Sequence, residues 1–301
     1  MDPLIQNQAS RINPYFILII GILAISTGAV FARMADAHSL VIAAYRVGLA
    51  SLPLLPLAYW KARDELCRLS SKDLKIVFLA GAFLAIHFAT WISSLNYTTI
   101  SNSVVLVSTS PLWVGILTPL LFKEKIRHIT VLSIFISIIG CAIIGSGDFS
   151  GGGRALKGDL LALTGGFCAA GYLILGRILR QRLSLMVYIS LCYTSAAVIL
   201  WIIVLLMGLP ISGFSAQTLW AIWGMALISQ VIGHSCYNWA LRYCSTTLVA
   251  LSFLGEPVGS TILAYLLFHE QPTLAKMMGG LIVLSGIYLA ARSEITPHNK
   301  N

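Results

Sequence analysis

The sequence has few charged residues. Asp, Glu, Lys and Arg make up 10% of its 301 residues, whereas hydrophobic residues make up 57%. Soluble domains usually carry about 25% charged residues, so this composition indicates that lipid rather than water surrounds most of the chain. An ordinary soluble globular domain is therefore excluded.

The sequence also lacks the motifs of intramembrane catalysis and of metal binding. It contains no H-E-x-x-H, no G-x-S-x-G and no paired acids within an apolar run, one of which hydrolysis or group transfer would need. Its six cysteines are scattered and include no C-x-x-C pair, which favours small packing residues over a disulfide or metal set. We therefore expect no enzymatic activity, no catalytic residue, no metal site and no cofactor.

Long apolar runs fill most of the chain instead. A helix needs roughly 20 apolar residues to cross the hydrocarbon core, and open strands would leave unpaired backbone groups in lipid. We therefore expect an all-α polytopic membrane protein with ten transmembrane helices. The predicted spans are 14–34, 39–59, 74–95, 99–122, 127–146, 158–178, 184–208, 217–240, 244–268 and 272–291.

The basic residues are unevenly divided between the two sides of these spans. The net charge is +9; 15 of the 20 Lys and Arg residues lie on the side of the N-terminus and four on the other, while Arg46 lies inside a span. The positive-inside rule then places both termini in the cytoplasm. The excess of Lys and Arg over Asp and Glu therefore indicates the orientation of the chain in the membrane, and we predict no nucleic-acid partner. We expect a multi-pass protein of the bacterial inner (cytoplasmic) membrane.

Two segments of the sequence, 94–124 and 240–270, match when the chain is shifted by 146 residues. Matches of Leu and Ile carry little weight because any two spans share them, but a Tyr, a Pro and a terminal Glu also recur at fixed spacing. These pairs are Tyr97 and Tyr243, Pro111 and Pro257, and Glu124 and Glu270.

Each half of the chain contains five predicted spans, an odd number, so the second half must enter the membrane from the opposite side. Inverted repeats of this kind form a central cavity that can open to either face in turn. We therefore expect two inverted five-helix repeats, at 14–147 and 158–291. A flexible, polar linker at 148–157 would join them.

The same segments carry a family resemblance. The patterns LNYTTISNS…SPLWVGILTPLLFKE and LRYCSTTLVALSFLGEPVGSTILAYLLFHE resemble the two halves of an EamA-type protein of the drug/metabolite transporter superfamily. The resemblance covers residues 17–291 and implies a ten-helix fold with cytoplasmic termini around a central substrate cavity. Relatives of this type move amino acids, other metabolites, vitamins and drugs, so the resemblance implies transport without naming a substrate.

Ionisable groups inside a span are costly unless paired or hydrated, which makes each a candidate site. Glu256 lies near the middle of the ninth span and precedes Pro257, which removes a helix hydrogen-bond donor. It would bind a substrate ammonium or exchange a proton; the alternative is a carboxyl group that holds a neighbouring helix. Arg46 is expected to tie carbonyl groups of adjacent helices or to extend outward along its stem, rather than to clamp a carboxylate.

Two stripes of polar and aromatic residues occupy related places in the third and eighth spans. His87 and Trp91 are four residues apart and so share a helix face. The stripe of the eighth span follows the same spacing and consists of Gln230, His234, Tyr237 and Asn238, and the 146-residue shift places Trp91 on Tyr237. Such stripes suit the wall of a cavity, although Trp and Tyr also anchor helices at the membrane interface. The full set of expected substrate-binding residues is Glu256, Trp91, His87, His234, Asn238, Tyr237, Gln230, Tyr172, Ser108 and Thr27.

Glu124 and Glu270 are expected at helix C-termini, where an anion opposes the helix dipole. We interpret them as structural or gating residues with basic partners.

These features favour a secondary carrier over a non-transporting receptor or lipid-handling subunit. A phosphorylated ligand would be met by several Lys or Arg residues, and near the middle of the membrane the spans offer none besides Arg46, which lies to one side. We therefore expect export of an amino acid or related zwitterion, by a monomer or homodimer, with protons as a candidate coupling partner. The alternative is uptake of a vitamin or a nucleoside-like metabolite such as S-adenosylmethionine.

Overall fold

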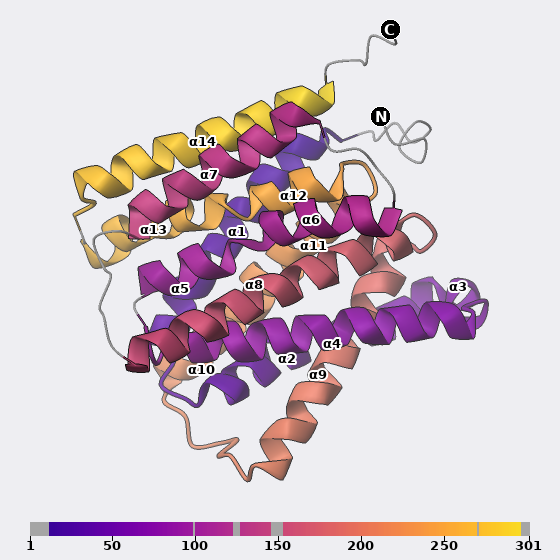
Figure 1. Ribbon diagram of the computed structural model, residues 1–301. Coiled ribbons are helices and arrows are strands. Elements are labelled where there is room, and N and C mark those ends of the chain that lie inside the picture. Colours follow the sequence, from indigo (N-terminus) through magenta and orange to yellow (C-terminus); the bar gives the residue numbers. More distant parts are fainter. Residues whose placement is uncertain (1–11, 99, 123–126, 146–152, 270, 296–301) are drawn as a thin grey trace, which may run out of the picture.

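The computed structural model describes residues 12–98, 100–122, 127–145, 153–269 and 271–295. All secondary structure in these ranges is helical (Figure 1). Nine helical segments within them are long and apolar enough to cross a membrane, and His128–Ile144 is a shorter apolar helix. The expectation of an all-helical membrane protein is confirmed by these segments together with the family described below.

The helices of the first half follow the predicted spans closely, with one break. The fourth span is divided into two helices by a turn at residues 108–109, and a short helix precedes the third span. The bounds are α1 Pro14–Met34, α2 Ser39–Lys61, α3 Arg63–Cys67, α4 Ser71–Ser94, α5 Ile100–Val107, α6 Ser110–Phe122 and α7 His128–Gly145.

The second half has more interruptions than the sequence predicts. The eighth span contains a π-helix, η2, the ninth is divided by a turn at residues 253–254, and the sixth begins five residues earlier than predicted. The bounds are α8 Gly153–Arg180, α9 Leu185–Leu206, α10 Ala216–Gly224, η2 Met225–His234, α11 Ser235–Ala240, α12 Thr246–Ser252, α13 Gly255–Phe268 and α14 Leu274–Ile295.

The breaks in the fourth and ninth spans lie at matching places in the two halves. Each turn comes shortly before a proline, Pro111 in α6 and Pro257 in α13, and these prolines are 146 residues apart. A proline has no N–H to continue the preceding helix, which explains why both spans restart there. A broken helix inside a membrane is tolerated where its free backbone groups are buried in protein or line a cavity.

Helices of the two halves pack against each other in matching pairs. The first span contacts the eighth, and its counterpart in the second half, the sixth span, contacts the third. In the same way, the first span contacts the ninth and the sixth contacts the fourth. The second span contacts the eighth, and its counterpart, the seventh span, contacts the third. Corresponding spans of the two halves also contact each other, through α2 and α9, α6 and α12, and α7 and α14. Figure 1 shows α7 beside α14 at one edge and α4 along α8. Exchange of the two halves therefore leaves this contact pattern unchanged.

The crossing of α7 and α14 repeats this match at single residues. A Cβ added at Gly140 would lie 2.7 Å from the carbonyl oxygen of Gly279, and one at Gly286 would lie 2.9 Å from that of Ser133. Gly140 corresponds to Gly286, and Ser133 to Gly279, by the 146-residue shift. Small residues allow two backbones to approach closely inside a membrane.

The beginning of α1 and the end of α14 lie on the same side of the bundle. The Tyr15 hydroxyl donates to the carbonyl oxygen of Ala291 at 3.4 Å, and Arg127, before α7, donates to the carbonyl oxygen of Ser293. On the opposite side, the Lys157 ammonium group contacts Tyr97, lying 4.3 Å from the centre of its ring. Large apolar side chains such as Phe135 and Leu281 point outward, as expected for a surface in lipid.

Candidate functional site

A buried cavity lies where the two halves meet. Its polar lining consists of Arg46, His87, Ser108, Ser110, His234 and Glu256. Aromatic rings of Phe88, Trp91 and Phe253 complete much of the wall. The side chains come from helices of both halves and from the breaks in the fourth and ninth spans.

The cavity is almost closed in this conformation. The space in which the centre of a water molecule fits is about 20 Å³, and one water requires roughly 10–15 Å³ on this measure. A metabolite does not fit without movement of the surrounding helices.

Arg46 of α2 lies in this cavity, contrary to the sequence-based expectation. Its side chain is 2% exposed, its Nε donates to Oε1 of Gln230 at 2.9 Å, and its guanidinium carbon lies 4.0 Å from the centre of the Phe88 ring. It does not extend outward, and among the described residues it donates to the side-chain carbonyl of Gln230 and not to a backbone carbonyl group. Because α2 packs against α4, α9 and η2, the side chain is enclosed by protein.

Glu256 lies across the same cavity, in the first turn of α13. Glu256 is 8% exposed, and its carboxyl group forms no ion pair with Arg46 within 4.0 Å in the described structure. An acid at a helix N-terminus is stabilised by the helix dipole. The break in the ninth span thus explains how a carboxyl group is accommodated in mid-span.

The stripe predicted on the third span lies on the cavity wall. The rings of His87 and Trp91 are parallel within 4°, with their centres 6.2 Å apart. Nδ1 of His87 is 2.9 Å from the carbonyl oxygen of Gly165, a contact in which Nδ1 donates because the carbonyl has no hydrogen to give. This bond fixes the ring and leaves its other nitrogen for the cavity.

The stripe predicted on the eighth span is divided. His234 lines the cavity, and Gln230 reaches it only through its bond to Arg46. Tyr237 and Asn238 do not line it. A π-helix has more residues per turn than an α-helix, so the i, i+4 grouping used for these residues does not hold across Met225–His234.

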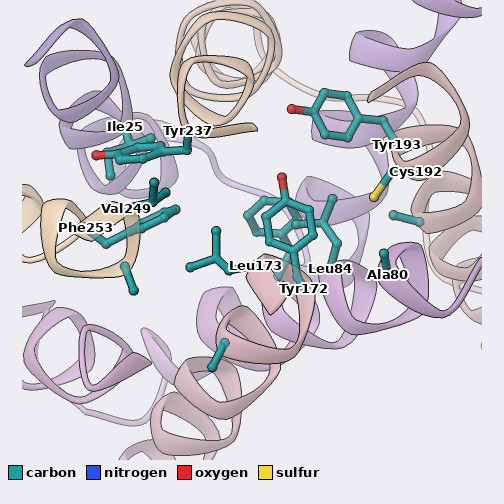
Figure 2. Packing of buried hydrophobic residues seen from close by; sticks show 14 of the residues in the cluster. Ile25, Ala80, Leu84, Tyr172, Leu173, Cys192, Tyr193, Tyr237, Val249 and Phe253 are labelled. Carbon is teal, nitrogen blue, oxygen red and sulfur yellow. The ribbon is translucent and has the colours of Figure 1, made fainter. Parts of the chain in front are cut away.

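Tyr172, Asn238 and Tyr193 form a separate buried network. The Tyr172 hydroxyl donates to Oδ1 of Asn238 at 2.7 Å, and Nδ2 of Asn238 donates to the Tyr193 hydroxyl at 3.1 Å. Both tyrosines belong to the cluster of buried hydrophobic residues, and Figure 2 shows Tyr172 near Leu84 and Leu173. Because the amide is satisfied on both sides, this network holds α8, α9 and α11 together.

Tyr237 packs beside the cavity wall without lining it. Its ring stacks on Phe253, with centres 4.1 Å apart and planes 17° apart (Figure 2). Phe253 itself lines the cavity, so Tyr237 supports a wall residue from behind.

The two smaller predicted site residues differ in position. Ser108 lies in the turn between α5 and α6 and lines the cavity. Thr27 is half-buried, and its hydroxyl shares a hydrogen bond of 2.8 Å with Ser229 outside the lining. Glu124 and Glu270 lie outside the described residues.

Several buried polar atoms of the lining have no hydrogen-bond partner among the described residues. These atoms are Nη1 of Arg46, Nε1 of Trp91, Oγ of Ser108 and Nδ1 of His234. Buried polar groups are nearly always paired, and exceptions gather where a ligand or water is bound. In the described ranges no group of three or more His, Cys, Asp or Glu side chains is placed to hold a metal.

The sequence pattern of the EamA-like transporter family matches residues 13–146 and 156–292, nearly the whole chain. The chain belongs to the EamA-like transporter family. It is therefore a multi-pass membrane transporter, as the resemblance and the helices both indicate.

Individual relatives agree with this family. An uncharacterized transporter of Clostridium kluyveri is 25% identical over 79% of this chain and 78% of its own length. One of Archaeoglobus fulgidus is also 25% identical, over 84% of this chain and 88% of its own length. A solved crystal structure with 18% identity covers 95% of this chain and all of its own, with a TM-score of 0.77, which supports the fold alone.

Proposed function

We propose that this protein is a secondary carrier that exports a small zwitterionic metabolite, most simply an amino acid, by alternating access. The observation that carries the proposal is the closed cavity between the halves, in which one acid and one base face unpaired polar atoms and aromatic rings. Ionisable residues inside a membrane mark substrate or ion pathways.

In this proposal Glu256 receives the positive centre of the substrate. It is the one acidic residue among the described groups that line the cavity, and a carboxylate is the partner that an ammonium group requires inside lipid. His87, Trp91, His234 and Ser108 form the surrounding wall. Gln230, Tyr172, Asn238, Tyr237 and Thr27 act behind it, by holding Arg46 or the helices that carry the wall.

We further propose that the two halves are inverted repeats, an arrangement that allows alternating access. Supporting this are the 146-residue shift, the odd number of spans in each half and the matching pairs of contacts between halves. We place the repeats at 14–147 and 158–291, although α8 already begins at Gly153, within the predicted linker.

We place both termini in the cytoplasm and the protein in the inner membrane of a bacterium. The 15-to-4 bias of basic residues supports this orientation, and the contact between Tyr15 and Ala291 supports placing both ends of the bundle on one side. The working unit is a monomer or a homodimer.

Uptake of a ring-bearing metabolite such as S-adenosylmethionine is the second candidate. The rings of Phe88, Trp91 and Phe253 in the lining favour it, because aromatic faces attract cationic ligands. The two candidates differ in the substrate that they require, because a nucleoside-like metabolite contains an aromatic ring and an amino acid need not.

Transport in proteoliposomes tests the proposal. Vesicles containing the purified protein would be loaded with the twenty protein amino acids, or separately with S-adenosylmethionine and nucleosides, and efflux followed by mass spectrometry. Efflux of at least one amino acid, lost in the Glu256→Gln variant, is the expected result. Efflux equal to that of protein-free vesicles for every cargo would refute the carrier proposal.

Proton coupling through Glu256 is part of the same proposal. The charged and titratable groups that face Glu256 in the cavity are Arg46 of α2, His87 of α4 and His234 of η2. If a proton moves with the substrate, an imposed pH gradient drives flux in the native protein and fails to do so in Glu256→Gln. Equal pH dependence in both proteins would remove Glu256 from the coupling.

A further inference from the structure

We infer that the transported molecule carries a carboxylate, and that this group binds at the N-terminal end of α6, between Arg46, Trp91 and Ser108. This inference rests on the proposed function and adds a second recognition point opposite Glu256. It restricts the substrate to molecules with both a positive centre and a compact carboxylate, and it gives a role to Arg46.

The first step is the correspondence between the two helix breaks. Glu256 lies in the first turn of α13, where its carboxyl group is inside the cavity. The corresponding residue in α6, 146 positions earlier, is Ser110, which lines the same cavity. The described first turn of α6 contains no acidic residue. One half of the protein thus supplies its own anion at a helix N-terminus, and the other half has a neutral residue there.

The second step is the kind of polar atom found near that neutral position. Nη1 of Arg46 and Nε1 of Trp91 are donors only, both lie in buried side chains of the cavity lining, and neither has a partner in the described structure. The Ser108 hydroxyl, next to α6, is unpaired as well. A site with an excess of unpaired donors and one positive charge requires an acceptor with negative charge.

The third step is the way in which Arg46 is held. Gln230 binds Nε of Arg46, and the Phe88 ring supports the face of its guanidinium group. Both contacts leave Nη1 unpaired and fix the plane of the group. A guanidinium group held in this way is prepared for a planar carboxylate.

The last step concerns which anion fits. A phosphate group at neutral pH usually attracts several Lys or Arg side chains, whereas Arg46 is the one Lys or Arg residue of the described cavity lining, together with His87, His234 and the acid Glu256. A single negative charge balances Arg46, and a single positive charge balances Glu256. An α-amino acid or a related zwitterion satisfies both groups.

Thermal stability of the purified native protein tests this inference, because a ligand that binds the folded state raises its apparent stability. Three panels would be compared: the twenty protein L-amino acids, their amides, and the amines obtained by removing the carboxylate. At least one amino acid should raise the melting temperature. Its amide and its amine should bind at least about tenfold more weakly, as expected for a lost charge-assisted contact.

Stabilisation by amides or amines equal to that by the acids would overturn the carboxylate inference. It would leave a carrier for organic cations, and so the wider carrier proposal, in place. No stabilisation by any panel, together with no efflux from the proteoliposomes described above, would overturn both.

A designed variant sharpens the test. Ser110→Glu places at α6 the carboxylate that we infer the substrate supplies. We expect the preference for the acid over its amide to fall at least about tenfold in this variant. Ser285→Ala, at an exposed position of α14 away from the cavity lining, is the control and should keep the native preference; an unchanged preference in Ser110→Glu would contradict the inference.

Trp91→Phe provides an independent variant if Ser110→Glu does not purify as a folded protein. It keeps an aromatic ring and removes the indole N–H. The expected result is again a fall of about tenfold in the preference for acid over amide. A uniform loss of affinity for both compounds would instead assign Trp91 a packing role and count against the carboxylate position.

Discussion

The two broken spans have the same backbone plan and different chemistry. In each, a short helix ends in a turn and a second helix restarts with a proline in its first residues. The break in the fourth span carries Ser108 and Ser110, which are neutral, whereas the break in the ninth carries Glu256. The comparison suggests that the repeats share a scaffold and that binding depends on where they differ.

The scaffold itself can be separated from the site. The crossing of α7 and α14 matches glycine and serine positions between the halves, and none of the described residues of these two helices lines the cavity. Changes at matched scaffold positions should therefore affect both halves alike and act on stability. Changes at the unmatched positions should affect transport.

The largest effect is expected for Glu256→Gln. Loss of the one cavity acid removes a charge-assisted contact worth about 1.5–3 kcal/mol, so flux at low substrate concentration should fall at least about tenfold. Efflux from proteoliposomes measures it. Ser110→Ala, at the corresponding position, is the matched control and should change flux less than about threefold; equal losses in the two variants would break the proposed asymmetry.

Alanine at Gly140 or at Gly286 should destabilise the protein by similar amounts. In each case the new methyl group would meet the facing helix, with backbone atoms less than 3 Å away, and overpacking costs about 1–3 kcal/mol. Thermal unfolding in detergent measures the change.

Gly280→Ala is the control for these two variants. Its Cβ would lie 3.6 Å from Val258 in ordinary contact, and alanine favours a helix over glycine. We expect no destabilisation there. If only one of the two matched glycines proved sensitive, the equivalence of α7 and α14 would be lost.

Asn238→Leu should reduce stability without changing recognition. It leaves the hydroxyl groups of Tyr172 and Tyr193 without their present amide partner, a loss of about 1–2 kcal/mol. The midpoint of thermal unfolding should fall, while the acid-over-amide preference of the remaining folded protein stays within about twofold. A clear change in that preference would return Asn238 to the binding site.

The smallest effect is expected for Thr27→Val. It removes the hydrogen bonds of the Thr27 hydroxyl to Ser229 and to the carbonyl oxygen of Ala24 with nearly unchanged volume, and bonds between helices in membranes average about 0.6 kcal/mol. The melting temperature should fall slightly and transport should be unchanged. A large loss of flux would show that the contact between α1 and η2 takes part in the conformational change.

The helical spans were predictable because each depends on local composition. Apolar length fixes the helix in lipid, and α1 begins and ends at the predicted residues. The cavity wall was predictable where it stays within a regular α-helix, as for His87 and Trp91. The grouping of residues by i, i+4 spacing did not hold across η2, since the change in helix type alters which residues share a face.

The place of Arg46 could not be predicted from the sequence. A single arginine within a span is compatible with an outward, a structural or a binding position, and only packing against α4 and η2 distinguishes them. The sequence offered one signal, its burial within an apolar run, which by itself suggests function.

The sequence by itself determined a membrane protein of the EamA-like type, because composition, charge bias and the 146-residue repeat are properties of the chain. The tertiary structure decided which polar residues meet. Arg46, Trp91 and Glu256 are far apart in sequence, and their grouping depends on how helices of the two halves pack. No local rule specifies such contacts, since they arise from shape and burial between distant segments.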